Sequence, residues 1–333
     1  TTASFSADMY LGSVDGGDFD TTTNGVQEDS AVMATYSFQI DLNTSFTGED
    51  SLDISLDAGN TVGITGANAA NHTSSVLEFD GNQTGDAVVV DGVSYTFPLG
   101  GATAFVADNG DASALFTTAC TYGGPTNTLD DCGLVNAAPT AGGTAFGGSY
   151  DFGNGFTAAF GYQTVVDAPN NGIMTDESRD AYAVNGSYTG SNYGISLTYA
   201  NIEDGVGGAT PEAWKEDTYT AINGYFSPEG EGLPSISVGY EIGDDASETD
   251  LDEITSFFVG LQWDDAFGPG SFGVAAGHSN TVESADEEYM YEAYYAYPVN
   301  DGMTVTPVIF TKESATAGQS DATGIMVKTS FSF

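Results

Sequence analysis

Basic residues are nearly missing from this chain of 333 residues. Lys and Arg together number 4, against 48 Asp and Glu, so the formal net charge is −44. A nucleic-acid partner is excluded, because no basic patch can neutralise phosphates. The acidity does not predict disorder, since 20 Phe and 18 Tyr supply the large apolar groups that a disordered acidic chain lacks.

Long apolar runs and helix-forming blocks are missing too. No segment reaches the roughly 18 consecutive apolar residues that a transmembrane helix needs. The chain also lacks long blocks of Ala, Leu, Glu and Lys, and its 44 Gly favour strands and tight turns. The remaining way to cross a membrane is a β-barrel.

Cysteine and histidine are scarce. Cys120 and Cys132 lie in one Gly/Pro/Asn-rich segment, which favours a disulfide in an oxidising compartment over two free thiols. His72 and His278 are far from them in sequence, which argues against a metal centre built with these cysteines. No G-x-S-x-G, H-E-x-x-H or P-loop motif is present, so we expect no enzymatic activity.

Apolar and polar residues alternate with a period of two in many segments bounded by turn residues. The stretch SLDISLDAG is typical, with Leu52, Ile54 and Leu56 on one face and Asp53 and Asp57 on the other. Sixteen such segments are predicted as strands, with ends defined to within a few residues. They are 3–12, 31–42, 50–58, 87–98, 102–107, 144–152, 156–166, 179–189, 192–201, 218–227, 233–243, 253–264, 271–280, 288–297, 302–311 and 322–333.

The connections between these segments alternate in length. Short turns such as GNG (153–155) and GSN (190–192) follow long ones, the longest being the 36 residues 108–143. Bacterial outer-membrane barrels combine tight periplasmic turns with long external loops. The sequence therefore predicts an all-β fold, a transmembrane antiparallel β-barrel of about 16 strands, as a single domain over residues 1–333.

One stretch resembles a known family. YSFQIDLNTSFTGEDSLDISLDAGN (36–60) resembles the barrel of cyanobacterial outer-membrane porins, in the wider family of carbohydrate-selective, OprB-like porins. Segments 93–110 and 147–163 and the ending VKTSFSF are similar to later parts of that barrel. The resemblance implies a passive diffusion channel, usually a homotrimer, in the outer membrane of a cyanobacterium, in contact with lipid and lipopolysaccharide.

Two features separate the chain from that family's usual pattern. Relatives commonly carry an N-terminal surface-layer-homology domain that holds peptidoglycan; we expect it to be missing here, and expect peptidoglycan contact only through such a domain. The strands also have fewer Arg and Lys than the resemblance implies. A preference for anions or sugar phosphates is therefore not expected.

The polar faces of the strands give the candidate pore-lining residues. Carboxylates in a pore concentrate cations and repel anions, so we expect a porin for inorganic ions and small hydrophilic solutes that prefers cations. The alternative is that several carboxylates lie at strand ends in bulk water and control nothing. The candidates are Asp8, Asp41, Asp53, Asp57, Asp151, Glu241, Asp264, Glu292 and Lys328.

The long connection 108–143 is expected to fold inward and constrict the pore. In large porins the third external loop does this, and 108–143 occupies that place in the order of connections. A Cys120–Cys132 bridge would lower the entropy of the loop and hold its shape. The alternative is a disulfide that only stiffens an external loop.

No cofactor is expected. Acidic clusters, such as Asp15, Asp18 and Asp20, offer the oxygen ligands that loosely bound Ca²⁺ or Mg²⁺ takes. None has EF-hand spacing, and a solvated acidic surface is the favoured interpretation. The competing function is a secreted or surface-attached acidic structural protein of a salt-adapted organism, with the apolar faces in an internal core.

Overall fold

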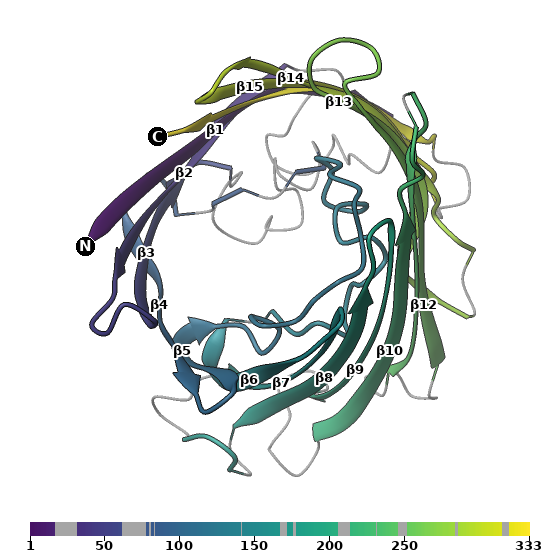
Figure 1. Ribbon diagram of the computed structural model, residues 1–333. Helices are drawn as coiled ribbons and strands as arrows, with labels where there is room; N and C mark the ends of the chain where they lie inside the picture. Colours follow the sequence, from purple (N-terminus) through teal and green to yellow (C-terminus); the bar gives the residue numbers. More distant parts are fainter. Residues whose placement is uncertain are drawn as a thin grey trace.

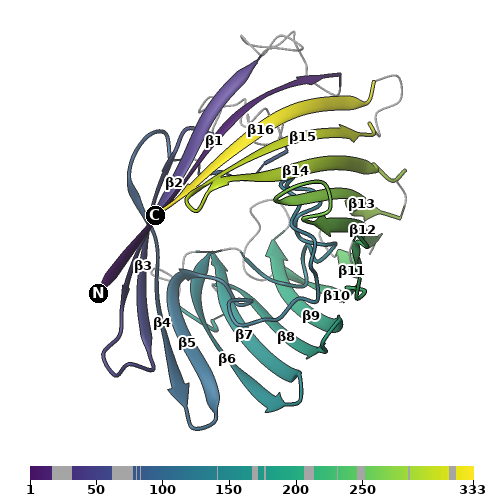
Figure 2. The same ribbon diagram turned by 45° about the horizontal axis from the view of Figure 1, so that its top comes forward.

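The computed structural model is a closed barrel in which every strand pairs antiparallel with its neighbours in sequence and β1 pairs with β16 (Figures 1 and 2). This confirms the predicted fold class, and each predicted segment overlaps one strand. The strands are β1 (Thr2–Asp15), β2 (Met33–Thr44), β3 (Ser51–Gly59), β4 (Val89–Leu99), β5 (Ala102–Gly110), β6 (Gly143–Gly153), β7 (Phe156–Val166), β8 (Arg179–Thr189), β9 (Tyr193–Gly205), β10 (Trp214–Phe226), β11 (Ser235–Asp245), β12 (Asp252–Asp264), β13 (Ser271–Val282), β14 (Met290–Asn300), β15 (Met303–Lys312) and β16 (Ala322–Ser332).

The structure describes most of the chain. The described residues are 1–16, 32–61, 78–79, 81–82, 84–140, 142–166, 172–175, 178–205, 214–230, 232–245, 252–283, 286–314 and 320–333. Within these ranges, no helix is long and apolar enough to span a membrane.

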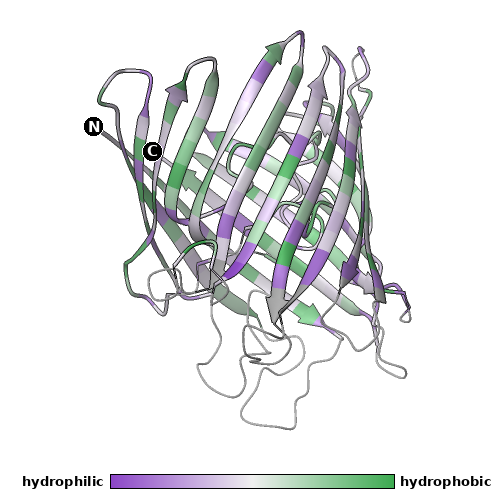
Figure 3. Cartoon of the chain, turned by 90° about the horizontal axis from the view of Figure 1, so that it is seen from below, coloured by the Kyte–Doolittle hydropathy of each residue, from purple (hydrophilic) through white to green (hydrophobic). Residues whose placement is uncertain are grey.

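The two faces of the wall are the reverse of those in a soluble barrel. On β9, Ile195 and Leu197 are 49% and 55% exposed on the outside, whereas Ser196 and Thr198 are 1% and 0% exposed on the inside. Hydrophilic and hydrophobic residues are also interspersed along the other strands visible in Figure 3. An apolar outer surface around a polar interior is the pattern of barrels surrounded by lipid.

The connections lie at two different ends of the barrel. Because consecutive strands are antiparallel, all the short connections are at one end and all the long ones at the other. Both termini are at the short-turn end, where the backbone N–H of Phe5 donates to the carbonyl oxygen of Phe333 at 2.9 Å and the N–H of Phe333 donates to the carbonyl oxygen of Phe5 at 3.0 Å. These two bonds extend the β1–β16 pairing to the last residue.

The third long connection, 111–142, lies inside the barrel along the inner wall (Figure 1). The main apolar cluster forms where this segment meets the wall. It contains Tyr122, Leu129, Phe258, Met290 and Tyr294, each buried. We call residues 111–142 the internal loop. The main hydrophobic core of the molecule therefore lies between the internal loop and the inner face of the wall.

Candidate functional site

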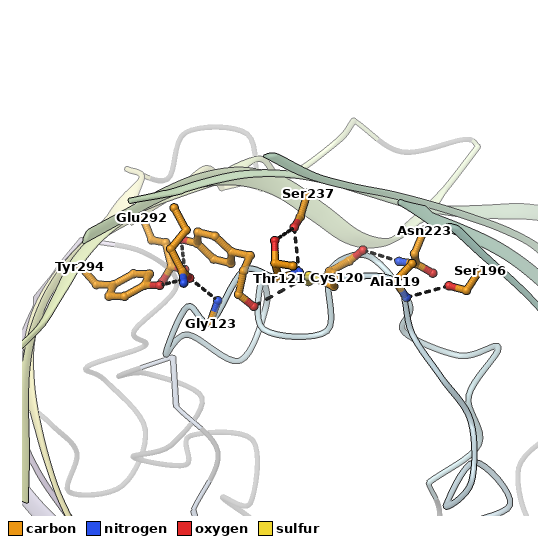
Figure 4. The surroundings of a disulfide bond; sticks show 12 residues. Ala119, Cys120, Thr121, Gly123, Ser196, Asn223, Ser237, Glu292 and Tyr294 are labelled. Carbon is orange, nitrogen blue, oxygen red and sulfur yellow. Dashed lines mark hydrogen bonds between the residues drawn. A yellow bond between two sulfur atoms is a disulfide. The ribbon is translucent and has the colours of Figure 1, made fainter. Parts of the chain in front are cut away.

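The internal loop is attached to the wall by an extended stretch, 117–123. In an extended chain, every second N–H points to the same side, and here alternate N–H groups each donate to a side chain on a different strand (Figure 4). The four bonds are Thr117 N–H to Asn185 Oδ1 of β8 at 3.0 Å, Ala119 N–H to Ser196 Oγ of β9 at 2.9 Å, Thr121 N–H to Ser237 Oγ of β11 at 3.0 Å, and Gly123 N–H to Gln262 Oε1 of β12 at 2.9 Å.

A buried carboxylate holds the second half of the loop. Glu241 of β11 is 1% exposed. Its carboxylate accepts backbone N–H bonds from Val135 at 3.0 Å, Asn136 at 2.9 Å and Ala137 at 2.8 Å, and a side-chain bond from Asn136 Nδ2 at 2.9 Å. These donors replace the water that a buried carboxylate loses. Glu241 therefore binds the backbone of residues 135–137 of the internal loop.

A second buried carboxylate holds the centre of the loop. Glu292 of β14 is 4% exposed and accepts hydrogen bonds from the Tyr122 hydroxyl and the Thr126 hydroxyl, each at 2.6 Å. Burial raises the pKa of Tyr122, and the nearby Glu292 charge raises it further. The phenol therefore stays protonated and keeps donating to Glu292 across the ordinary pH range.

The disulfide joins two parts of the loop. Cys120 and Cys132 are bonded, with their Cα atoms 6.5 Å apart, which confirms the predicted bridge. Asn223 of β10 donates to the carbonyl oxygen of Cys132 at 2.8 Å. A Cβ added to Gly239 would lie 1.8 Å from that same oxygen, so only glycine lets the loop backbone approach the wall here.

The second long connection also reaches the lumen. Lys312 of β15 forms an ion pair with Glu78 at 2.9 Å, and the hydroxyl of Thr128 on the internal loop donates to the same carboxylate at 2.6 Å. Phe79 stacks on Tyr10 of β1, with ring centroids 3.7 Å apart. Through Glu78 and Phe79, this connection contacts both the internal loop and β1.

The strand registers place all the predicted pore-lining residues on the lumen face. Asp41 lies opposite Ser55, and Asp53 lies opposite Asn43, to whose amide it is hydrogen-bonded. Asp8 forms an ion pair with Lys328 at 3.3 Å. These residues belong to β1, β2, β3 and β16.

Four other predicted pore-lining residues, Glu241, Glu292, Asp151 and Asp264, lie elsewhere on the lumen face. Glu241 and Glu292 face inward but lie beneath the internal loop, where they hold it rather than line open space. Asp151 and Asp264 lie at the short-turn end, where Asp151 accepts the N–H of Gly153 at 2.7 Å and Asp264 accepts the Ser271 hydroxyl at 2.6 Å.

Sequence reasoning missed several functional residues. The wall acceptors Asn185, Ser196, Ser237 and Gln262 are not among the predicted site residues, although each is a polar residue on the inward face of its strand. A row of small polar residues on successive strands was the available signal. Asp91 of β4 was also missed, because a register shift between Ser55 and Leu56 changes the alternation of that strand.

The described lumen is negatively charged. Lys312 and Lys328 both form ion pairs with carboxylates, so neither adds an uncompensated positive charge. No group of three or more His, Cys, Asp or Glu in the described part of the chain is arranged to coordinate a metal ion directly. Of the expected Ca²⁺ or Mg²⁺ ligands, Asp15 ends β1, and Asp18 and Asp20 lie outside the described residues.

The barrel is similar in structure to solved bacterial porins. The chain is similar in structure to OprB of Pseudomonas putida, with a TM-score of 0.67 and 14% identity over 99% of this chain and 93% of that one. The chain has the porin fold. A mutant porin of Rh. blastica gives a TM-score of 0.55 at 12% identity, with both chains covered in full.

A further solved porin gives a TM-score of 0.58 at 13% identity, again with complete coverage of both chains. No protein-family model matches the chain, and no curated protein matches it in sequence. The relationship to these porins is therefore one of fold.

Proposed function

We propose that this chain is an outer-membrane porin, a passive diffusion channel for inorganic ions and small hydrophilic solutes that prefers cations. The observation that carries the proposal is the inverted wall: Ile195 and Leu197 are exposed outside while Ser196 and Thr198 are buried inside. Apolar side chains on the outside of the barrel are stable in contact with lipid tails. The polar lumen of a 16-stranded barrel can hold water and let hydrophilic solutes pass.

Cation preference follows from the charge of the open side of the lumen. Asp41, Asp53 and Asp91 lie on β2, β3 and β4, and the described lysines of the lumen are already paired. A wall with this charge lowers the free energy of a cation in the pore and raises that of an anion. We propose that the internal loop narrows the path beside these carboxylates, supported by its attachment to the wall through Glu241 and Glu292.

The finer assignments rest on the resemblance of segment 36–60. It supports a cyanobacterial outer membrane, a homotrimer, and contact with lipid and lipopolysaccharide. Carbohydrates belong among the candidate solutes on the same ground. The chain's role is transport, with no catalysis and no cofactor.

Bilayer recording tests the proposal against the structural-protein alternative. We expect the folded protein to need detergent and to form stepwise ion-conducting channels in planar bilayers. Heat-unfolded protein at the same concentration is the control and should give no steps. A folded protein that stays soluble without detergent and conducts nothing would contradict the proposal.

A further inference from the structure

One carboxylate in the open part of the lumen has no partner for one of its oxygens. Asp57 of β3 is 9% exposed, and its Oδ1 has no hydrogen-bond partner among the described residues. Asp41, one strand away, contrasts with it, since Asp41 accepts bonds from Gln39 Nε2 at 2.7 Å and Ser55 Oγ at 2.6 Å. A buried carboxylate oxygen without a donor is costly, so its presence needs an explanation.

Other carboxylates surround Asp57. The charges of Asp91 and Asp41 both act on it. The register shift between Ser55 and Leu56 pairs Asp57 with Val89 and turns Asp91 toward the lumen. β-bulges commonly re-aim a side chain in this way. Two neighbouring strands therefore bring like charges together.

Two cavities are lined by residues that neighbour Asp57 on β2, β3 and β4. A cavity of about 330 Å³ is lined by Asp53, Ser55, Asp91 and Asp111 among others. A second, polar cavity of about 190 Å³ is lined by residues that include Asp8 and Gln39, the latter being the cross-strand partner of Asp57. Both cavities contain carboxylates and have room for ions and water.

The internal loop adds a further acid to this region. Burial raises the pKa of Asp111, and the charge of Asp91 adds to the rise, while the Gly142 N–H opposes it. The lysines Lys312 and Lys328 are both engaged with other carboxylates. Lys328 is paired with Asp8 and lies over the Tyr10 ring, 5.7 Å from its centroid, and Lys312 is paired with Glu78.

We propose that Asp57, Asp91 and Asp41 form a binding site for a divalent cation of the Mg²⁺ type in the pore wall. The site deepens the proposed porin function, on which its role in transport rests, because it names a class of ion that the channel retains. The described carboxylates are not arranged for direct coordination by three groups. Mg²⁺ fits this arrangement, since it commonly keeps several waters and uses one or two carboxylates.

The test is a Mg²⁺ titration of the K⁺ current through single channels, at constant ionic strength so that screening does not change. We expect Mg²⁺ to reduce the wild-type current, and Asp57→Asn to raise the half-inhibiting concentration about tenfold, equivalent to about 1.4 kcal/mol. Asp151→Asn is the matched control, because Asp151 faces the lumen at the short-turn end. It should leave the titration unchanged.

A second readout does not require conduction. A cation that binds the folded barrel raises its thermal unfolding midpoint, so MgCl₂ should raise the midpoint of the detergent-folded wild type and not that of Asp57→Asn. Equal responses of the two proteins in both measurements would overturn the site, as would no response to Mg²⁺ at all. If Mg²⁺ raised the thermal unfolding midpoint of the wild type but the protein formed no channels, the Mg²⁺ site would be supported and the porin function would be overturned.

Discussion

Tyr122 donates a 2.6 Å hydrogen bond to Glu292 from the centre of the internal loop to the barrel wall, although 170 positions separate them in sequence. Tyr122→Phe removes the donor and leaves a buried carboxylate with one hydroxyl partner fewer. Hydrogen bonds to charged groups contribute about 2 kcal/mol, so the free energy of unfolding should fall by about that amount. Urea unfolding of the folded protein in lipid vesicles measures it.

Tyr291→Phe is the control for this substitution. Tyr291 neighbours Glu292 on β14 but is 44% exposed on the outside of the barrel. Removing its hydroxyl should change the free energy of unfolding little. If both variants lost the same free energy, or neither lost any, the Tyr122 bond would not hold the loop.

Removing the disulfide should change the channel. The Cys120–Cys132 bridge closes part of the loop, and such bridges typically stabilise folded proteins by about 2–4 kcal/mol. Replacing both cysteines with serine should increase open-channel noise and shift the single-channel conductance, because the loop gains freedom inside the lumen. An unchanged conductance from a correctly folded barrel would mean that the loop does not set the width of the path.

The turn between β2 and β3 should give a pH-dependent stability. The Ser45 hydroxyl, the Thr47 N–H and the Tyr95 hydroxyl donate to Asp50 and hold its pKa well below the usual range. Because the folded-state pKa is lowered, this contribution is complete above the unfolded-state pKa of about 4 and is lost as the pH falls through the folded-state value. Asp50→Asn should therefore lower the unfolding midpoint at neutral pH.

The difference between wild type and Asp50→Asn should narrow as the pH falls below about 4. Thermal unfolding across this range checks the prediction. A gap that stays constant with pH would show that the charge of Asp50 is not what stabilises the turn.

The strands were predictable because their signal is local. In SLDISLDAG the period of two places Leu52 and Ile54 on one face and Asp53 on the other, whatever the rest of the chain does. The alternation of connection lengths then favoured a barrel that crosses a membrane over a soluble sandwich. No comparable period exists in 111–142, so its path along the wall could not be derived.

Glycines on the lumen face mark that path. A Cβ added to Gly161 would lie 1.7 Å from the carbonyl oxygen of Ala112, and one added to Gly239 would lie 1.8 Å from that of Cys132. A glycine inside a strand indicates close approach of another backbone, but it does not say which segment approaches. For the same reason, alternation placed Glu241 on the inner face without revealing that the loop covers it.

The most direct test of cation preference is the reversal potential of a planar bilayer that separates two KCl concentrations. We predict a reversal potential whose sign shows that K⁺ permeates more readily than Cl⁻. Its magnitude should decrease when Asp53 and Asp57 are both replaced by Asn. Asp151→Asn should change it less, since that residue lies beside a turn at the mouth. A reversal potential of zero, or one of the sign set by Cl⁻ permeation, would contradict the account.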